Sequence, residues 1–254
     1  MIELTAADGH AFSSYRSEPA GTPKGAVVVL QEVFGVNGHI RSVADSFAAK
    51  GYLAIAPALF DRVNKGVELG YDGGGLAAGT EMAKQAGERG PLADIQAAVA
   101  AAGSAGRVAV VGYGWGGYLS FLSANQVDGL ACAIGYYGGG IVDQSREKRR
   151  IPTLLHFGES DRSIPFEEGV CQFRFRRPDV SVYSYPAGHG FNRGEGDGYD
   201  EAAARLAFER TLSMIAQYVE GQAPIPLKNA GAYLSQKVEK KKKPKIGAID
   251  GPPE

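Results

Sequence analysis

The sequence has few cysteines, little net charge and no long apolar run. Its two cysteines, Cys132 and Cys171, are too few for a disulfide framework, so we expect a reducing, cytoplasmic compartment. No apolar run approaches the roughly 18 residues that would span a membrane, and the first residues do not resemble a signal peptide. The formal net charge of −1 provides no global field that would attract nucleic acid or a membrane surface. We therefore expect neither partner.

Glycine, in contrast, is abundant. The chain has 36 glycines in 254 residues, about twice the ordinary share of roughly 7 %. There is no G-X-Y period, and 44 % of the residues are hydrophobic, which excludes a collagen-like chain or a flexible linker. The glycines separate short apolar runs, as residues in tight turns do.

Short apolar runs alternate with helical patterns along residues 1–220. Beyond an opening hairpin at 3–17, strands are predicted at 26–30, 52–56, 108–111, 130–134, 153–157 and 180–185. Helices are predicted at 40–50, 91–102, 115–123 and 200–218, and loops at 62–90 and 138–150. Strands that are apolar throughout are buried on both faces of a sheet. The alternation therefore predicts an α/β domain with a mostly parallel central sheet and helices on both faces.

The composition changes after residue 220. Residues 221–254 carry seven lysines against three acidic residues, together with several prolines. We predict a single domain over 1–220, followed by a solvated tail or an arm that lies on the domain. Electrostatic docking of the tail to an anionic partner is the alternative.

Three positions carry the chemistry, each at the carboxyl end of a predicted strand. A glycine-rich turn at 112–117 opens a helix, Asp161 follows the strand at 153–157, and His189 follows the strand at 180–185. This is the chain order of the triad in α/β-hydrolases. In such a triad the histidine is the base, the aspartate orients it, and N–H groups at the helix start stabilise an oxyanion.

At this point the sequence resembles the dienelactone hydrolases, a branch of the α/β-hydrolases, over nearly all of residues 1–220. The motifs that carry the resemblance are Gln31-Glu32-Val33-Phe34-Gly35-Val36-Asn37, Gly112-Tyr113-x-x-Gly116-Gly117, Gly135-Tyr136-Tyr137-Gly138 and Ala187-Gly188-His189-x-Phe191. The resemblance implies an α/β-hydrolase fold and hydrolysis of small lactones or esters that bear a carboxylate. We expect no metal and no cofactor.

The resemblance also implies a role for individual residues. Members of this family use a cysteine nucleophile aided by an aspartate, a histidine and the glutamate of the Gln-Glu motif. The matching residues are Asp161 as the acid, His189 as the base, Glu32 as the glutamate, Trp115 and Val33 as backbone oxyanion donors, and Arg193 as the cation that binds the substrate carboxylate. A second substrate arginine has no clear match, and Arg62 and Arg89 are its candidates.

One departure from the family pattern concerns the reaction itself. Gly114 stands at the nucleophile position, and glycine has no side chain that can attack a carbonyl carbon. We expect none of the other nucleophiles to replace it, because Cys132 lies inside a strand, Cys171 in a predicted helix far from the turn, and Ser120 well inside the helix after the turn. The histidine His156 lies in the middle of a predicted strand, and we predict that it is a core residue and has no catalytic role.

Three interpretations of Gly114 stay open. The chain is a hydrolase whose activity is weak, water-mediated or lost; it is a non-catalytic relative that binds a small carboxylate or a protein partner; or it is an engineered variant of an active enzyme. A minor alternative is NAD binding through Gly112, Gly114 and Gly117, which match the dinucleotide fingerprint. That fingerprint needs an acid about 20 residues further on, and residues 130–137 contain none. The sequence makes no prediction of the oligomeric state.

Overall fold

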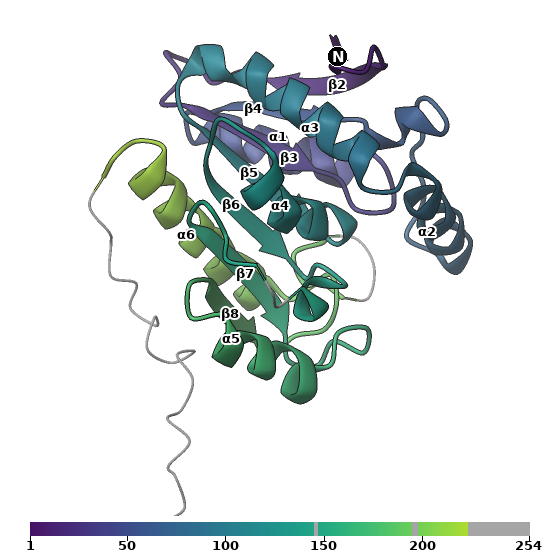
Figure 1. Ribbon diagram of the computed structural model, residues 1–254, viewed down its shortest axis with the longest axis vertical. Coiled ribbons are helices and arrows are strands. Elements are labelled where there is room, and N and C mark those ends of the chain that lie inside the picture. Colours follow the sequence, from purple (N-terminus) through teal and green to yellow (C-terminus); the bar gives the residue numbers. More distant parts are fainter. Residues whose placement is uncertain (145–146, 195–197, 223–254) are drawn as a thin grey trace, which may run out of the picture.

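A central sheet with helices on both faces makes up the structure, a computed structural model that describes residues 1–144, 147–194 and 198–222 (Figure 1). Within these residues eight strands form one sheet in the order β1-β2-β4-β3-β5-β6-β7-β8. The strands are β1 (Ile2–Thr5), β2 (Ala11–Ser17), β3 (Ala26–Leu30), β4 (Leu53–Pro57), β5 (Val108–Tyr113), β6 (Leu130–Tyr136), β7 (Thr153–Gly158) and β8 (Ser181–Tyr185). The β1–β2 and β2–β4 pairs are antiparallel and all other pairs are parallel, so the predicted mostly parallel sheet is confirmed.

Helices cover the two faces of this sheet. They are α1 (Gly38–Ala49), α2 (Gly73–Ala86), α3 (Arg89–Ala102), α4 (Trp115–Gln126), the short α5 (Gln172–Arg176) and α6 (Glu201–Tyr218). α1 and α6 lie on one face, where the rings of Phe47 and Phe208 are 5.4 Å apart, and α3 and α4 pack together on the other (Figure 1). The core is continuous because strands such as β3 are buried at every position. The predicted helices on both faces are confirmed.

The largest error of the sequence prediction lies between residues 62 and 90. This stretch was expected to be a loop, but it contains α2, and α3 begins at Arg89. The glycines at the start of α2 hid the helix, because glycine is a poor helix former. Close packing explains one glycine of this helix: a Cβ on Gly79 would lie 1.7 Å from the carbonyl oxygen of Val33. The Asp72 side chain caps the helix by accepting a hydrogen bond from the N–H of Gly75.

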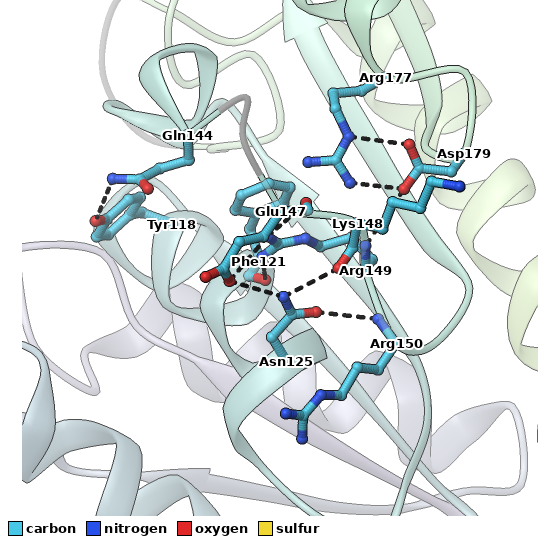
Figure 2. Close-up of polar contacts among 10 residues, drawn as sticks. All are labelled: Tyr118, Phe121, Asn125, Gln144, Glu147, Lys148, Arg149, Arg150, Arg177 and Asp179. Atoms are coloured by element: carbon cyan, nitrogen blue, oxygen red, sulfur yellow. Dashed lines mark hydrogen bonds and ion pairs between the residues drawn. The ribbon is translucent and has the colours of Figure 1, made fainter.

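The loop before β7 is fixed to α4 (Figure 2). Nη1 of Arg149 donates to the carbonyl oxygen of Phe121 at 3.1 Å, and its guanidinium carbon lies 4.2 Å from the centre of the Phe121 ring. Oδ1 of Asn125 accepts from the N–H of Arg150 at 3.0 Å. Burial and the charge of Arg177 lower the pKa of Arg149. This contact lies near the amino end of β7, away from the carboxyl ends where the predicted site residues are.

The order in which the chain adds strands to the sheet reverses at β3. From β3 the chain goes to β4 on one side and later returns to β5 on the other, so the carboxyl ends of β3 and β5 flank a topological switch point. Leu30 and Gly112 are partners in the register at this end. In open α/β sheets such a point is where ligands bind. We therefore expect a ligand site between the loops after Leu30 and Tyr113.

The predicted tail falls largely outside the described residues. α6 ends at Tyr218, close to the predicted boundary at 220, while 223–254 are not described and the tail stays a prediction. The predicted loop at 138–150 is also described only in part, without residues 145 and 146. Within the described part of the chain, no helix is both long and apolar enough to cross a membrane.

Candidate active site

The turn between β5 and α4 holds Gly114 in a backbone conformation that favours glycine. Its φ is +52° and its ψ is −117°, and α4 begins at the next residue. Two hydrogen bonds fix the turn: the N–H of Gly114 donates to the carbonyl oxygen of Tyr136 at 3.0 Å, and that of Gly116 donates to Gln31 at 3.0 Å. This is the geometry of a strained strand-to-helix elbow.

The glycines around Gly114 are required by close packing. An added Cβ would lie 1.9 Å from the carbonyl oxygen of Gly116 if it were on Gly112, and 2.5 Å from that of Tyr136 if it were on Gly117. Gly114 is different, because the three atoms nearest to its ideal Cβ belong to Glu32 and lie at 3.5–3.7 Å, which is ordinary van der Waals contact. The structure thus has space for a Cβ atom at position 114, although the chain carries no side chain there.

Asp161 and His189 form a hydrogen-bonded pair at the carboxyl ends of β7 and β8. Nδ1 of His189 lies 2.7 Å from Oδ2 of Asp161, whose side chain is fully buried. Oδ1 of Asp161 accepts from the N–H groups of Ser163 and Ile164, so the carboxylate is fixed. The His189 side chain is 36 % exposed, which leaves its other edge accessible. This is the arrangement in which an aspartate orients a histidine base.

Glu32 lies directly beside the elbow and is almost completely buried. Burial raises the pKa of its carboxyl group. The charges of Arg193 and His189 and a hydrogen bond from Tyr71 act in the opposite direction. Oε2 of Glu32 has no hydrogen-bond partner among the described residues. A buried carboxylate with an unused acceptor atom is unusual, and such a group is a candidate for a functional role.

Arg193 places a guanidinium group next to Glu32 in the site. Its Nη1 lies 3.8 Å from Oε1 of Glu32. Its guanidinium carbon lies 4.7 Å from the centre of the Tyr71 ring and 5.7 Å from that of Phe34. The side chain is mostly buried, yet it lines the same cavity as Glu32. Stacking on rings holds a guanidinium in place while its N–H groups stay available for an anion.

A cavity of about 630 Å³ unites these residues. The predicted residues that line it are Gly114, His189, Glu32, Trp115, Val33 and Arg193. α2 forms one wall of this cavity through Leu76, Thr80, Ala83 and Lys84. The volume and the mixture of apolar walls with a few polar groups are typical of a small-molecule site. Asp161 does not line the cavity and is connected to it through its hydrogen bond with His189.

The two predicted oxyanion donors lie next to the elbow. Trp115 is the first residue of α4, and the first N–H groups of a helix have no acceptor within the helix. Val33 follows Glu32 in the loop that the Gly116–Gln31 hydrogen bond ties to the elbow. The positive end of the α4 dipole also faces this point. The structure brings both backbone segments to the same cavity.

The comparisons with known proteins agree with this geometry. A model of the dienelactone hydrolase family matches residues 12–219. The chain belongs to the dienelactone hydrolase family. It is 32 % identical over 225 residues to carboxymethylenebutenolidase 1 of Cupriavidus pinatubonensis and 33 % identical over 227 residues to the carboxymethylenebutenolidase of Pseudomonas putida. Each alignment covers 85 % of this chain and 95 % of the relative.

Solved structures share the fold. The structure of a putative dienelactone hydrolase from Klebsiella pneumoniae matches with a TM-score of 0.74 at 28 % identity, covering 85 % of this chain and 99 % of that chain. An esterase of Pyrococcus furiosus matches with a TM-score of 0.62 at 15 % identity, covering 86 % of this chain and 92 % of the esterase. The predicted α/β-hydrolase fold is therefore confirmed, and the family assignment rests on the closer sequence relatives.

Neither candidate for a second substrate arginine lines the cavity. Arg62 lies outside the cavity and is held by carboxylates, with 2.7 Å to Asp94 and 2.8 Å to Asp8. Arg89 is absent from the cavity lining as well. Lys84 of α2 is the second cationic side chain of the cavity wall, and it was missed because α2 was taken for a loop.

The residues excluded as substitute nucleophiles lie away from the elbow. Cys132 is buried in β6, and burial raises its pKa to about 12. Burial, then the nearby carboxylate of Glu167, raises the pKa of Cys171. Oγ of Ser120 donates to the carbonyl oxygen of Ile134 inside the core. None of the three lines the cavity.

The core role of His156 is supported, because its two ring nitrogens contact Tyr185 and Thr211 at 2.8 and 3.1 Å. The glycines of the NAD fingerprint also have a structural explanation, because Gly112 and Gly117 allow α4 to pack closely on the strands.

Three tyrosines of the cavity, Tyr71, Tyr118 and Tyr137, were not singled out from the sequence. Tyr71 lies in a glycine-rich loop just before α2, where no pattern marked it. Tyr137 belongs to the Gly-Tyr-Tyr-Gly motif, which carried the family resemblance without showing which tyrosine faces the cavity. Its ring centre lies 5.2 Å from that of His189. The position of Tyr137 at the end of β6 was the one signal that could have identified it.

Proposed function

We propose that this chain hydrolyses small lactones or esters that bear a carboxylate, slowly and with water as the nucleophile. The observation that carries the proposal is that the His189–Asp161 pair and Glu32 meet at the cavity that Gly114 lines. The family supplies the reaction class, and the relatives named carboxymethylenebutenolidase support a substrate that combines a lactone with a carboxylate.

The substrate class follows from the charges of the cavity. Arg193 is stacked on aromatic rings and provides N–H donors to an anion. Glu32 neutralises part of its charge at 3.8 Å, so a substrate carboxylate must compete with that contact. The ester carbonyl would then lie next to the elbow, where the N–H groups of Trp115 and Val33 can stabilise the oxyanion.

The reaction proceeds through two proton transfers. Asp161 holds Nδ1 of His189, so Nε2 is the atom that accepts a proton from water while the water oxygen bonds to the acyl carbon. The tetrahedral intermediate then collapses as the C–O bond to the leaving group breaks. The leaving oxygen takes the proton back from His189. The products are the carboxylic acid and the alcohol or enol, and the enzyme is regenerated.

Gly114 limits the rate of this chemistry. Removing a side-chain nucleophile from a hydrolase typically costs on the order of a million-fold in turnover and leaves about a thousand-fold acceleration over water. The parent chain should therefore be a weak enzyme. The same glycine favours a second candidate function, which is binding of a small carboxylate without turnover. In that case Arg193 and the cavity bind the carboxylate, and the His189–Asp161 pair has no catalytic role.

Steady-state hydrolysis separates the two functions. Matched pairs of aryl esters, with and without a carboxylate on the acyl group, are incubated with the parent and with His189→Ala. A parent rate that exceeds the rate of His189→Ala by at least about tenfold, and that favours the carboxylate-bearing ester, supports the hydrolase. Equal rates in the two proteins, together with carboxylate binding measured by calorimetry, would favour the binding function.

A further inference from the structure

Tyr137 has an unusual backbone conformation. Its φ is +36°, the only positive φ of a non-glycine residue in the described part of the chain. A bulky side chain rarely adopts this region, and such outliers occur where the surrounding structure enforces them, often at functional sites. The N–H of Tyr137 donates to the carbonyl oxygen of His156 at 2.8 Å, which fixes the residue at the carboxyl end of β6. The fold thus holds this phenol in one place.

The hydroxyl group of Tyr137 is buried and has no hydrogen-bond partner among the described residues. The same is true of Oε2 of Glu32. Both residues line the cavity, and the charge of Glu32 acts on Tyr137. Burial raises the pKa of the Tyr137 hydroxyl, so it is a neutral donor at physiological pH. A donor and an acceptor that are both buried and unused at one cavity point to a small polar molecule that fits both.

Position 114 carries no side chain, and an ideal Cβ there would meet no atom closer than 3.5 Å. The ideal Cβ position of residue 114 lies 3.6 Å from Oε1 of Glu32, and its three nearest neighbours are all Glu32 atoms. His189 lies across from Tyr137, with their ring centres 5.2 Å apart. A buried water typically makes about three hydrogen bonds to polar groups. Glu32, Tyr137 and His189 supply that number.

We propose that Tyr137 and Glu32 hold the attacking water beside Gly114, in the place where a side-chain nucleophile would stand. The water donates one hydrogen to the Glu32 carboxylate and the other to Nε2 of His189, and it accepts from the Tyr137 hydroxyl. Its remaining lone pair faces the substrate carbonyl. Tyr137 keeps its proton and Glu32 keeps its negative charge throughout. The transferred proton goes to His189, as in the proposed function on which this inference rests.

This arrangement predicts a specific coupling between positions 137 and 114. Removing the hydroxyl with Tyr137→Phe should lower kcat of the parent by about tenfold to a hundredfold and leave KM unchanged, because in this proposal Tyr137 holds the attacking water and does not bind the substrate. In a Gly114→Cys background the thiol replaces the water in the attack. There Tyr137→Phe should change kcat/KM, which reports the steps up to acylation, by less than about threefold.

Tyr136→Phe is the matched control. Tyr136 precedes Tyr137, is fully buried and bonds Thr211 at 2.7 Å, but it does not line the cavity. Loss of the Tyr136 hydroxyl group should leave kcat within about twofold of the parent value. Equal losses from Tyr137→Phe in the parent and in the Gly114→Cys background would show a structural or substrate-binding role and would overturn the proposal. A parent-like kcat of Tyr137→Phe would overturn it as well.

A second measurement keeps this test separate from that of the hydrolase function. Crystal structures of the parent and of Tyr137→Phe at about 1.5 Å should show an ordered water within about 3.2 Å of the Tyr137 hydroxyl and the Glu32 carboxylate in the parent and none at that point in the variant. If the parent hydrolyses no ester but holds this water, the proposed function fails and the water site stands. If the parent shows no water there, the water site is wrong whatever the activity.

Discussion

Gly114→Ala tests whether the elbow conformation requires glycine. An alanine there must adopt φ +52° and ψ −117°, a region that costs a non-glycine residue about 1–3 kcal/mol. Part of this cost is offset, because alanine lowers the entropy of the unfolded chain by the equivalent of about 0.4–1 kcal/mol. The three atoms nearest to the added Cβ belong to Glu32 and lie at 3.5–3.7 Å, so the Cβ itself causes no clash. We therefore expect a net loss of about 1–2 kcal/mol in the free energy of unfolding.

Urea and thermal unfolding measure this loss, which corresponds to a fall of about 2–8 °C in the melting temperature of a chain of this size. Gly21→Ala is the neutral control, because nothing lies within 4 Å of its ideal Cβ and its φ is not positive. Gly112→Ala is the severe control, because its Cβ would lie 1.9 Å from a backbone oxygen. If Gly114→Ala is as stable as Gly21→Ala, the strained elbow is refuted.

The charges and glycines of the site lead to three more predictions. Arg193→Met should weaken binding of small carboxylates by about tenfold to a hundredfold in calorimetry, because the charged donor is lost; unchanged affinity would remove Arg193 from the site. Burial raises the pKa of Glu32 in the folded chain. At a pH between the ordinary and the raised pKa, the folded chain keeps a proton that the unfolded chain has released. The free energy of unfolding therefore falls as the pH rises through this range. Glu32→Gln should therefore be more stable than the parent at pH 8, with the gain shrinking towards about pH 4.5, and a gain independent of pH would contradict the burial effect. NAD should leave the melting temperature unchanged, whereas a rise that grows with NAD concentration would support the dinucleotide alternative.

The sheet could be predicted from the sequence because its strands are short and apolar throughout. Strand β3 was expected at 26–30 and is found there, and α1 ends close to the predicted stop at Gly51. α2 could not be predicted in the same way, because its glycines reflect contacts with a distant segment. The contact of Gly79 with Val33 is tertiary information that no local pattern contains. The Asp72 cap was the one local signal of this helix, and the glycines after it concealed that signal.

The site was predictable where chemistry and topology coincide. The chain order of elbow, acid and histidine suggested that Asp161 and His189 would meet, and they lie 2.7 Å apart. The family resemblance, rather than any local pattern, suggested Glu32 and Arg193. For Tyr137 the only signal was its position after a predicted strand, because its positive φ and its unpaired hydroxyl depend on the packing at the end of β6.

The most direct test of the account compares ester and lactone hydrolysis by the parent and by Gly114→Cys. The structure has space for a Cβ atom at position 114, with Glu32 beside it and the His189–Asp161 pair at the same cavity. A thiolate in this place should form an acyl-enzyme and raise kcat/KM by at least about 100-fold, at some loss of stability. If a folded Gly114→Cys with an intact cavity hydrolyses no ester or lactone faster than the parent, the cavity is not a hydrolase site with its nucleophile position at Gly114.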